Sequence, residues 1–352
     1  MTGVKRWKRY EGRARPGNRE RRRRRALGLP VGSLLTKGLV LTAILMLAGV
    51  AAWYVLGRGG YRSAVLGIVA GPGAPSYQAS IGDVGRPLAV ATSPDGRLVY
   101  VGESDGQRAV RIFDRQEREA GIIEAPDPAQ GWLPLDIAVA RTGEVYVVDG
   151  AVGAIYEFSP EGEFVRKLPP PEGLDVWSPS ALAFDDVGNM YVTERFESAS
   201  EDRHRVLVFS PEGELIRQFG SKGNDLGELN YPSAIAIDDQ GRVYVNNMNT
   251  RIDVFTSEGR HVTRFGAGEG EQGVGLARGL ALDREGRLYA VDVTGQRVAV
   301  YDTKSEGFPF LYAFGSFGLE GGKFRFPASV AVDVSGRVYV ADRENYRVQI
   351  WS

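Results

Sequence analysis

Carboxylates recur at one position of a repeated pattern and are the residues of this chain best placed to do chemistry. Each stands three residues after a tyrosine, as Asp292 does after Tyr289. The residues at this position are Glu103, Asp149, Glu194, Asn247, Asp292 and Asp342. Carboxylates gathered in a ring could bind Ca²⁺, which takes roughly six to eight oxygen ligands.

Arginines that follow at a constant distance offer a structural interpretation of the same carboxylates. The candidate pairs, five residues apart, are Glu103 with Arg108, Asp292 with Arg297, and Asp342 with Arg347. Arg205 and Arg251 occupy the corresponding place after Glu194 and Asn247. Because the pairing recurs in nearly every copy, we favour ion pairs that stabilise the fold, with Ca²⁺ binding as the alternative.

Other catalytic groups are scarce in these 352 residues. The chain has no cysteine and only two histidines, His204 and His261. It therefore lacks disulfides, thiolate nucleophiles and cysteine-type zinc sites, and a site with several histidines is hard to build. No nucleophile elbow of the G-x-S-x-G type and no phosphate-binding P-loop occurs in the sequence.

Six copies of one unit must position these residues. The turn glycines of the copies are Gly96, Gly143, Gly188, Gly241, Gly286 and Gly336, at intervals of 45 to 53 residues. Each copy predicts four strands: an apolar first strand, a second around the tyrosine, a third ending in an aromatic residue, and a polar fourth. Strands repeated at this interval are typical of propeller blades. One extra residue before Tyr100 predicts a β-bulge in the first copy.

The ends of the repeated region predict how the ring closes. The chain stops at Ser352, directly after the third strand of the last copy. Residues 77–81, YQASI, have the character of a fourth strand and precede the first copy. An open ring would leave a bare sheet edge, so this segment should complete the last blade. The predicted fold class is therefore an all-β, six-bladed β-propeller over residues 76–352.

The residues before the propeller predict a membrane anchor. Residues 1–37 contain thirteen Lys or Arg and two Glu, and residues 38–57 contain no charged side chain. About 20 apolar residues in a helix span a hydrocarbon core, and the basic side of a span stays in the cytoplasm. Residues 58–75 form a Gly- and Pro-rich linker. We expect a single-pass protein of the cell membrane with an extracytoplasmic propeller; a cleaved signal peptide is the alternative.

Two of the copies resemble NHL repeats. They are FGSKGNDLGELNYPSAIAIDDQGRVYVNNMNTRIDVF (219–255) and GSFGLEGGKFRFPASVAVDVSGRVYVADRENYRVQIW (315–351). The resemblance covers about residues 76–352 and is weaker in the first two copies. It implies a membrane-anchored bacterial-type binding platform. Some six-bladed relatives are lyases or hydrolases that need a channel-facing histidine or metal, so a metal-dependent propeller hydrolase or lyase is the alternative to a binding scaffold.

Aromatic residues before the first strands are the candidate binding residues. They are Trp132, Trp177, Tyr231 and Phe326. The two tryptophans lie in long Pro-containing connections and predict an exposed recognition patch, whereas the other two are expected to pack between blades. The segment 194–204 is expected to be a further long loop of this surface. Residues 38–352 carry 30 basic and 42 acidic side chains, which favours a protein or small-ligand partner over nucleic acid.

Overall fold

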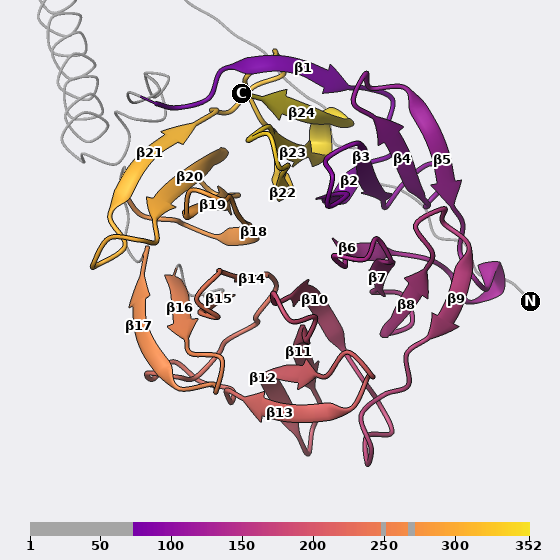
Figure 1. The fold of residues 1–352 in the computed structure, drawn as a ribbon, viewed down its shortest axis with the longest axis vertical. Coiled ribbons are helices and arrows are strands. Elements are labelled where there is room, and N and C mark those ends of the chain that lie inside the picture. Colours follow the sequence, from indigo (N-terminus) through magenta and orange to yellow (C-terminus); the bar gives the residue numbers. More distant parts are fainter. Residues whose placement is uncertain (1–72, 248–250, 267–271) are drawn as a thin grey trace, which may run out of the picture. The chain divides into compact units, whose positions relative to one another are not determined.

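The computed structural model describes residues 73–352 apart from 248–250 and 267–271, and these residues form six four-stranded antiparallel sheets around a central axis (Figure 1). Blade 1 consists of β2 (Pro87–Thr92), β3 (Leu98–Glu103), β4 (Val110–Asp114) and β5 (Glu119–Ile123). Blade 2 consists of β6 (Pro134–Val139), β7 (Val145–Asp149), β8 (Ala154–Phe158) and β9 (Phe164–Lys167). Blade 3 consists of β10 (Pro179–Phe184), β11 (Met190–Glu197), β12 (Asp202–Phe209) and β13 (Leu215–Phe219). Blade 4 consists of β14 (Ile235–Ile237), β15 (Val243–Asn247), β16 (Arg251–Phe255) and β17 (His261–Phe265). Blade 5 consists of β18 (Ala277–Leu282), β19 (Arg287–Asp292), β20 (Arg297–Asp302) and β21 (Phe310–Phe314). Blade 6 consists of β22 (Pro327–Val332), β23 (Val338–Asp342), β24 (Arg347–Trp351) and β1 (Tyr77–Ile81). Two 3₁₀ turns accompany them, η1 (Pro128–Gln130) and η2 (Arg343–Asn345). The predicted all-β, six-bladed propeller is confirmed.

A turn between the first and second strands explains why Asp, Gly and Tyr recur at fixed spacing. In blade 5, Asp283 Oδ1 accepts the N–H of Arg287 at 2.8 Å, and Tyr289 donates its hydroxyl to Oδ2 at 3.1 Å. Gly286 has a φ of +80°, which is costly for residues with a Cβ atom. The same bonds join Asp238 to Tyr244 and Asp333 to Tyr339 in blades 4 and 6.

Blade 1 departs from this turn in a way that the sequence did not predict. Ser93 donates its N–H to the carbonyl of Leu98, five residues on, whereas the corresponding bond in blade 5 joins Asp283 to Arg287, four residues on. The pairing of β3 with β4 continues without a register shift through Tyr100. The extra residue therefore lies in the turn, and the predicted bulge at Tyr100 is wrong.

The closing strand lies where the sequence predicts. Strand β1 pairs antiparallel with β24, and the last sheet has the order β1-β24-β23-β22 (Figure 1). Ser76 and Ser352 exchange two backbone hydrogen bonds of 2.8 and 3.0 Å beside this pair. Because the outer strand of blade 6 comes from the N-terminal end of the propeller, both ends of the ring are held in one sheet.

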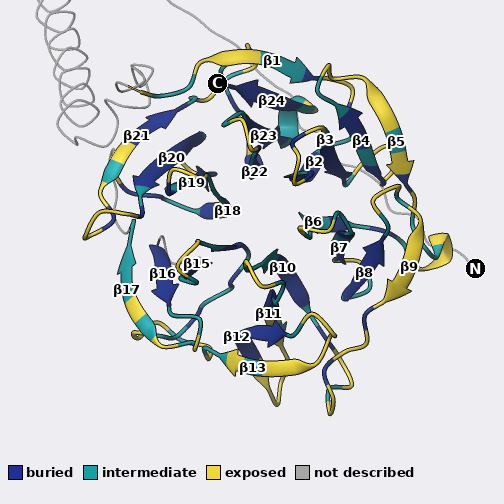
Figure 2. Cartoon of the chain, in the orientation of Figure 1, coloured by how far each residue is buried: buried dark blue, intermediate teal, exposed yellow. Residues whose placement is uncertain are grey.

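The hydrophobic core lies between neighbouring blades rather than at the centre of the ring. Six clusters of buried side chains each combine residues of two adjacent blades. The aromatic residue that ends each third strand is buried there: Phe113, Phe158, Phe209, Phe255, Tyr301 and Trp351. The outer strands are more exposed than the inner ones, and β9 is exposed along its whole length (Figure 2). The inner strands and their neighbours are thereby held rigidly around the axis.

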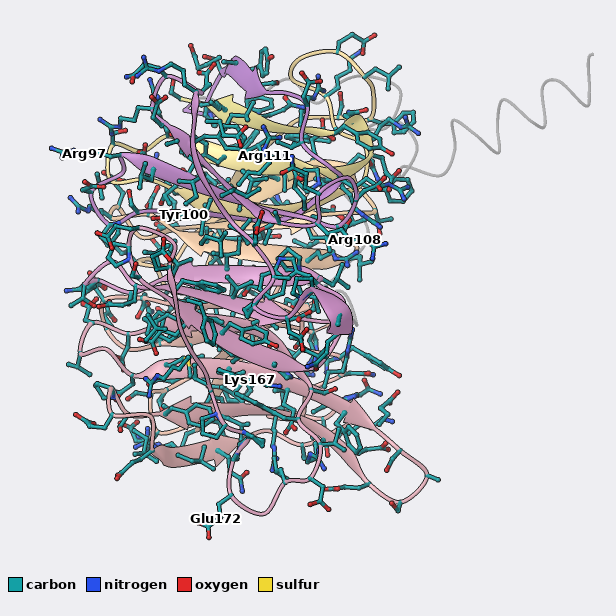
Figure 3. All side chains as sticks on the ribbon, turned by 90° about the vertical axis from the view of Figure 1, so that its right-hand side faces the viewer. Arg97, Tyr100, Arg108, Arg111, Lys167 and Glu172 are labelled. Atoms are coloured by element: carbon teal, nitrogen blue, oxygen red, sulfur yellow. The ribbon has the colours of Figure 1, made fainter. Side chains whose placement is uncertain are left out.

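The propeller has two faces, which the first blade illustrates. Arg97 lies in the turn between its first and second strands, and Arg108 lies in the turn between its second and third strands. In side view the two residues lie at opposite faces (Figure 3). We call the face of Arg108 the top face; it carries every second-to-third turn and every connection between blades. The face of Arg97 is the bottom face.

The predicted membrane anchor cannot be compared with the fold. Its basic tail (1–37), its apolar span (38–57) and most of the linker (58–75) lie outside the described residues. Within the described part of the chain, no helix is long and apolar enough to cross a bilayer.

Candidate functional site at the mouth of the central channel

The recurrent carboxylates bind backbone N–H groups of the connection that enters each blade. Asp292 accepts from Gly275 at 3.1 Å and Asp342 accepts from Arg325 at 2.7 Å. The other bonds of this kind are Glu103 with Gly85, Asp149 with Leu133, and Asn247 with Asn230. Each acid thereby joins the end of the second strand to the start of the first strand of its own blade. This is a structural use of the carboxylate, because a buried N–H needs an acceptor.

Arginines complete these contacts, largely as the sequence predicts. Arg297 binds Asp292 at 3.1 Å and Arg347 binds Asp342 at 2.8 Å. Glu194 is fully buried and binds Arg205 at 2.7 Å and Arg203 at 3.2 Å.

The predicted pair of Glu103 with Arg108 is wrong. Arg108 precedes β4, lies in a turn with a φ of +50° and reaches the edge of the top face (Figure 3). Glu103 binds Arg111, the second residue of β4, at 3.2 Å. The cause is local: the strand begins after Arg108, so the arginine inside the strand takes the carboxylate.

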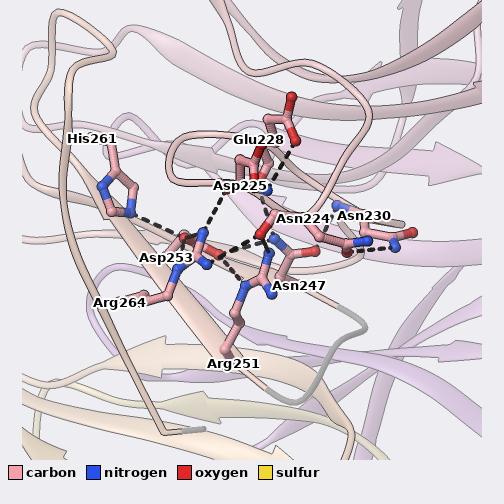
Figure 4. A network of polar contacts seen from close by, with 9 residues as sticks. All are labelled: Asn224, Asp225, Glu228, Asn230, Asn247, Arg251, Asp253, His261 and Arg264. Atoms are coloured by element: carbon pink, nitrogen blue, oxygen red, sulfur yellow. Dashed lines mark hydrogen bonds and ion pairs between the residues drawn. The ribbon is translucent and has the colours of Figure 1, made fainter.

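Blade 4 places its carboxylate on the third strand instead of the second. Asn247 occupies the recurrent position, and Asp253 of β16 takes the acidic role (Figure 4). The Asp253 carboxylate is fully buried and binds Arg264 at 3.0 Å, His261 at 3.1 Å and Arg251 at 3.3 Å. Asn247 donates to it at 2.9 Å. One acid therefore organises the polar contacts of this blade.

The five acids proposed as a calcium ring do not gather into one cluster. Among residues 73–352 outside the two gaps, no group of three or more His, Asp or Glu side chains could hold a metal ion. Glu103, Glu194, Asp292 and Asp342 each bind an arginine of their own blade. Burial raises the pKa of Asp149, which binds backbone N–H groups only.

The exposure predicted for the two tryptophans is wrong. Trp132 is 4% exposed and packs on Tyr156, with ring centroids 5.6 Å apart. Trp177 is 5% exposed and packs on Phe209 at 6.0 Å. Their long connections fold back, so that each indole fills the space between two blades. Burial of such large rings is strongly favourable, so long Pro-containing loops do not keep them in water.

Two further expectations about this surface also need correction. Segment 194–204 is not a loop: β11 and β12 continue as a hairpin as far as the pair Glu197 and Asp202. Phe326, expected between blades, is 50% exposed. Tyr231 lies on the ring of His204, with centroids 4.8 Å apart. Tyr231 and Phe326 therefore remain at least partly accessible on the top face, whereas the two tryptophans are buried beneath it.

The central channel is lined by the first strands of all six blades and has a volume of about 370 Å³. Three arginines line it. Arg195 lies at the top-face end of β11 and Arg278 at the top-face end of β18, whereas Arg141 lies in the bottom-face turn after β6 and binds Asp186. The Arg195 guanidinium lies over the Tyr231 ring at 5.9 Å. Asn246 positions Arg278 by donating to the carbonyl of Ala277 in the neighbouring blade. The mouth of the channel is therefore cationic and has an aromatic edge.

The half-buried acid Asp136 lies deeper in the channel wall. Asp136 of β6 accepts the N–H of Leu182 in the next blade at 2.9 Å. Burial raises the pKa of Asp136 from 3.8 to about 7, and two backbone hydrogen bonds oppose this shift only partly. The carboxyl group therefore gains and loses a proton near neutral pH.

Stability should fall as pH rises because of Asp136. Unfolded Asp136 loses its proton near pH 4, whereas the folded group keeps it until about pH 7. The folded state binds more protons between these values, so its stability decreases across this window, by at most about 4 kcal/mol. Channel water reduces the effect. Asp136→Asn should reduce the change in melting temperature between pH 4 and 8. Glu172→Gln, in an exposed loop, should leave that change as it is in the wild type. If the melting temperature of Asp136→Asn varied with pH as that of the wild type does, this prediction would be wrong.

Sequence reasoning missed these channel residues, although a signal was present. Arg278 and Asp136 are charged residues within first strands that otherwise read as apolar and buried. Ala277 also breaks the rule that a proline starts the first strand. A charge inside such a strand marks a side chain that faces the channel, where water or a ligand can solvate it.

Comparison with known proteins agrees with this architecture. The NHL repeat family model matches residues 324–351. NHL repeat-containing protein 3 of Mus musculus is 29% identical over 176 residues, which are 47% of this chain and 48% of that protein. This chain is a six-bladed propeller whose last blade matches the NHL repeat model and which is similar to NHL-repeat proteins.

Two enzymes are also similar to this chain. Peptidyl-glycine alpha-amidating monooxygenase B of Xenopus laevis is 26% identical over 300 residues, 74% of this chain but 33% of that protein. The chain thus spans half or less of the length of these curated relatives. A streptogramin B lyase structure superimposes with a TM-score of 0.56 at 13% identity, covering 78% of this chain and 96% of that chain. At that identity, the likeness shows the fold alone.

Proposed function

We propose that this protein is a membrane-anchored NHL propeller that binds a partner or ligand outside the cell membrane at its top face. The observation that carries the proposal is the channel mouth, where Arg195 and Arg278 line the channel without an acidic partner among the described residues. Rigid blades hold this mouth, and binding residues concentrate on loops displayed by such scaffolds. The anchor rests on the uncharged segment 38–57 and the basic residues before it.

Exposed aromatic residues beside the mouth support binding at this face. Phe326 is 50% exposed and Tyr346 is 45% exposed, and both lie on the top face of blade 6. Exposed aromatic groups next to charges are typical of recognition surfaces. The bottom face is dominated by short turns of the Asp–Gly type, whose side chains are used in holding the turn.

The test of the proposal has two parts. A photo-reactive amino acid at Tyr346 of the full chain should crosslink a partner in cells, whereas one at Val187, in a bottom-face turn, should not. Equal crosslinking from both positions, or from Val187 alone, would contradict a top-face site.

The second part concerns topology. Protease added to intact spheroplasts should remove the propeller and leave the Arg-rich tail protected, because the tail is expected in the cytoplasm. Antibodies against an epitope at each end report the result. A propeller that survives protease until the membrane is permeabilised would show that the proposed orientation is wrong.

A channel enzyme, a metal-dependent hydrolase or lyase, is the second candidate function. Asp136 is the observation that favours it, since a carboxyl group with a pKa of about 7 suits general acid–base catalysis. Metal content of the purified protein and its melting temperature with and without Ca²⁺ separate the two functions. One tightly bound metal per chain with Ca²⁺-dependent melting would favour the enzyme.

A further inference from the structure

Guanidinium groups from three blades, those of Arg195, Arg278 and Arg343, approach one another at the channel mouth, and Arg86 of a fourth blade lies next to this group through Glu344. Arg195 comes from blade 3 and Arg278 from blade 5, and Arg343 opens η2 in blade 6. Arg86 precedes the first strand of blade 1 and contacts Glu344 at 2.7 Å. The charges of Arg343 and Arg195 act on Arg278, since both add to the effect of burial in lowering its pKa. Arg195, Arg278 and Arg343 are therefore close enough to repel one another, and Arg195 and Arg278 remain exposed to the water of the channel.

Acids compensate these charges only in part. Glu344 binds Arg86 and lies 3.7 Å from Arg343, and it is the one carboxylate within ion-pair distance of either group in the described chain. The Nε atoms of Arg86 and Arg343 are buried without a hydrogen-bond acceptor. Buried polar groups are nearly always hydrogen-bonded, so unpartnered guanidinium nitrogens indicate a missing acceptor.

Asp136 does not neutralise the mouth either. It lines the same channel, but its carboxyl group binds the N–H of Leu182 and keeps its proton up to about pH 7. Arg195 and Arg278 form no ion pair with any described residue. A cationic site with so few compensating charges is stabilised when an anion enters it.

Strained backbone at the mouth agrees with a binding role. Arg86, Tyr231 and Phe326 each directly precede the position of a strand-starting proline, and their φ values are +47°, +52° and +50°. A left-handed conformation is unfavourable for residues other than glycine and is disfavoured further before proline. Strain of this kind concentrates at ligand sites, where the surrounding structure enforces it.

We propose that the channel mouth binds a small organic or inorganic anion that carries at least two negative charges, of the carboxylate or phosphate class, on Arg195, Arg278 and Arg343. Guanidinium groups bind both kinds of oxyanion in a bidentate manner. A channel of about 370 Å³ suits a small molecule. The inference rests on the proposed function, because it names the class of ligand for that same face.

Binding of defined anions to the full-length protein in neutral detergent tests this inference. Pyrophosphate and citrate serve as the phosphate and carboxylate probes, measured by calorimetry and by thermal shift at low salt. At least one should raise the melting temperature and bind with one ion per chain. Arg278→Gln and Arg195→Gln should each weaken binding at least tenfold, whereas Arg97→Gln on the bottom face should leave it unchanged.

A second readout separates a ligand site from a structural role. Relief of repulsion should make Arg278→Gln melt at a higher temperature than the wild type without anion, and at a lower one with saturating anion. The inference would be overturned if Arg278→Gln bound the probes with wild-type affinity, or if it melted at a lower temperature than the wild type without anion. It would also be overturned if the wild type bound neither probe. Tight, salt-sensitive binding of a single-stranded oligonucleotide in place of both probes would also overturn it.

These outcomes can be told apart from failure of the proposed function. Crosslinking from Tyr346 without anion binding would contradict the proposed class of ligand but would still support the proposed function as a binding scaffold. Anion binding that Arg278→Gln abolishes would support the inference even if Tyr346 captured no protein.

Discussion

The Ile81→Asp variant is expected to lose more than about 4 kcal/mol of stability, because an unpaired charge would enter the strand that closes the ring. Ile81 is 3% exposed, pairs with Val348 across β1 and β24, and packs in the cluster between blades 6 and 1. Deleting residues 76–82 should have a larger effect, since it also removes the whole β1–β24 ladder. Urea unfolding followed by tryptophan fluorescence measures both losses.

A matched change on the exposed side of the same strand provides the control. Gln78→Asp introduces the same carboxylate three residues away, at an exposed position. It should alter the free energy of unfolding by less than about 0.5 kcal/mol. Similar unfolding curves for Ile81→Asp and Gln78→Asp would mean that the closing strand contributes little to the ring.

Removal of the Asp253 carboxylate should cost about 3–5 kcal/mol, because it leaves buried cations without their counter-charge. Asp253→Leu would leave Arg251 and Arg264 without the carboxylate that both of them bind (Figure 4). Those arginines also donate to the carbonyls of Asn224 and Asp225, in the connection that enters blade 4. The loss should therefore loosen that connection as well, which hydrogen exchange of its amides would report.

A double variant tests the physical cause of this loss. Arg264→Met combined with Asp253→Leu removes an acid and a base together, so it should be more stable than Asp253→Leu alone. Glu258→Gln, at an exposed neighbouring turn, should be neutral. An Asp253→Leu protein as stable as the wild type would show that the buried contacts of blade 4 are dispensable.

The fold was predictable from the sequence because its determinants are local. Asp, Gly and Tyr hold a turn and the start of a strand within six residues, as Asp283 and Tyr289 do. Each four-stranded blade consists of consecutive hairpins, so strand order follows chain order. Ring closure followed from a missing fourth strand, since a sheet edge needs a partner. The ion pairs of Asp292 and Asp342 were predictable for the same reason, as acid and base lie on adjacent strands.

The surface of the channel could not be predicted in this way. Whether Trp132 is exposed depends on how its connection folds onto Tyr156, and that contact is set by the packing of two blades. Phe326 and Tyr231 have the same left-handed backbone before a proline, yet Phe326 is 50% exposed whereas Tyr231 packs on His204, so a neighbouring blade decides the difference.

The sequence by itself determined the number of blades, the strand pattern and the ion pairs of Asp292 and Asp342, because these depend on residues near one another in the chain. It also determined the closing strand, because the last copy has no fourth strand of its own. Only the tertiary structure decided that Arg195, Arg278 and Arg343 approach one another at one opening. They come from three blades, and the stretch from 38 to 352 is acidic overall. Their proximity arises when the ring closes and brings the top-face ends of distant strands around one axis. Charge summed along a chain cannot reveal such a cluster, since electrostatic interaction depends on distance in space.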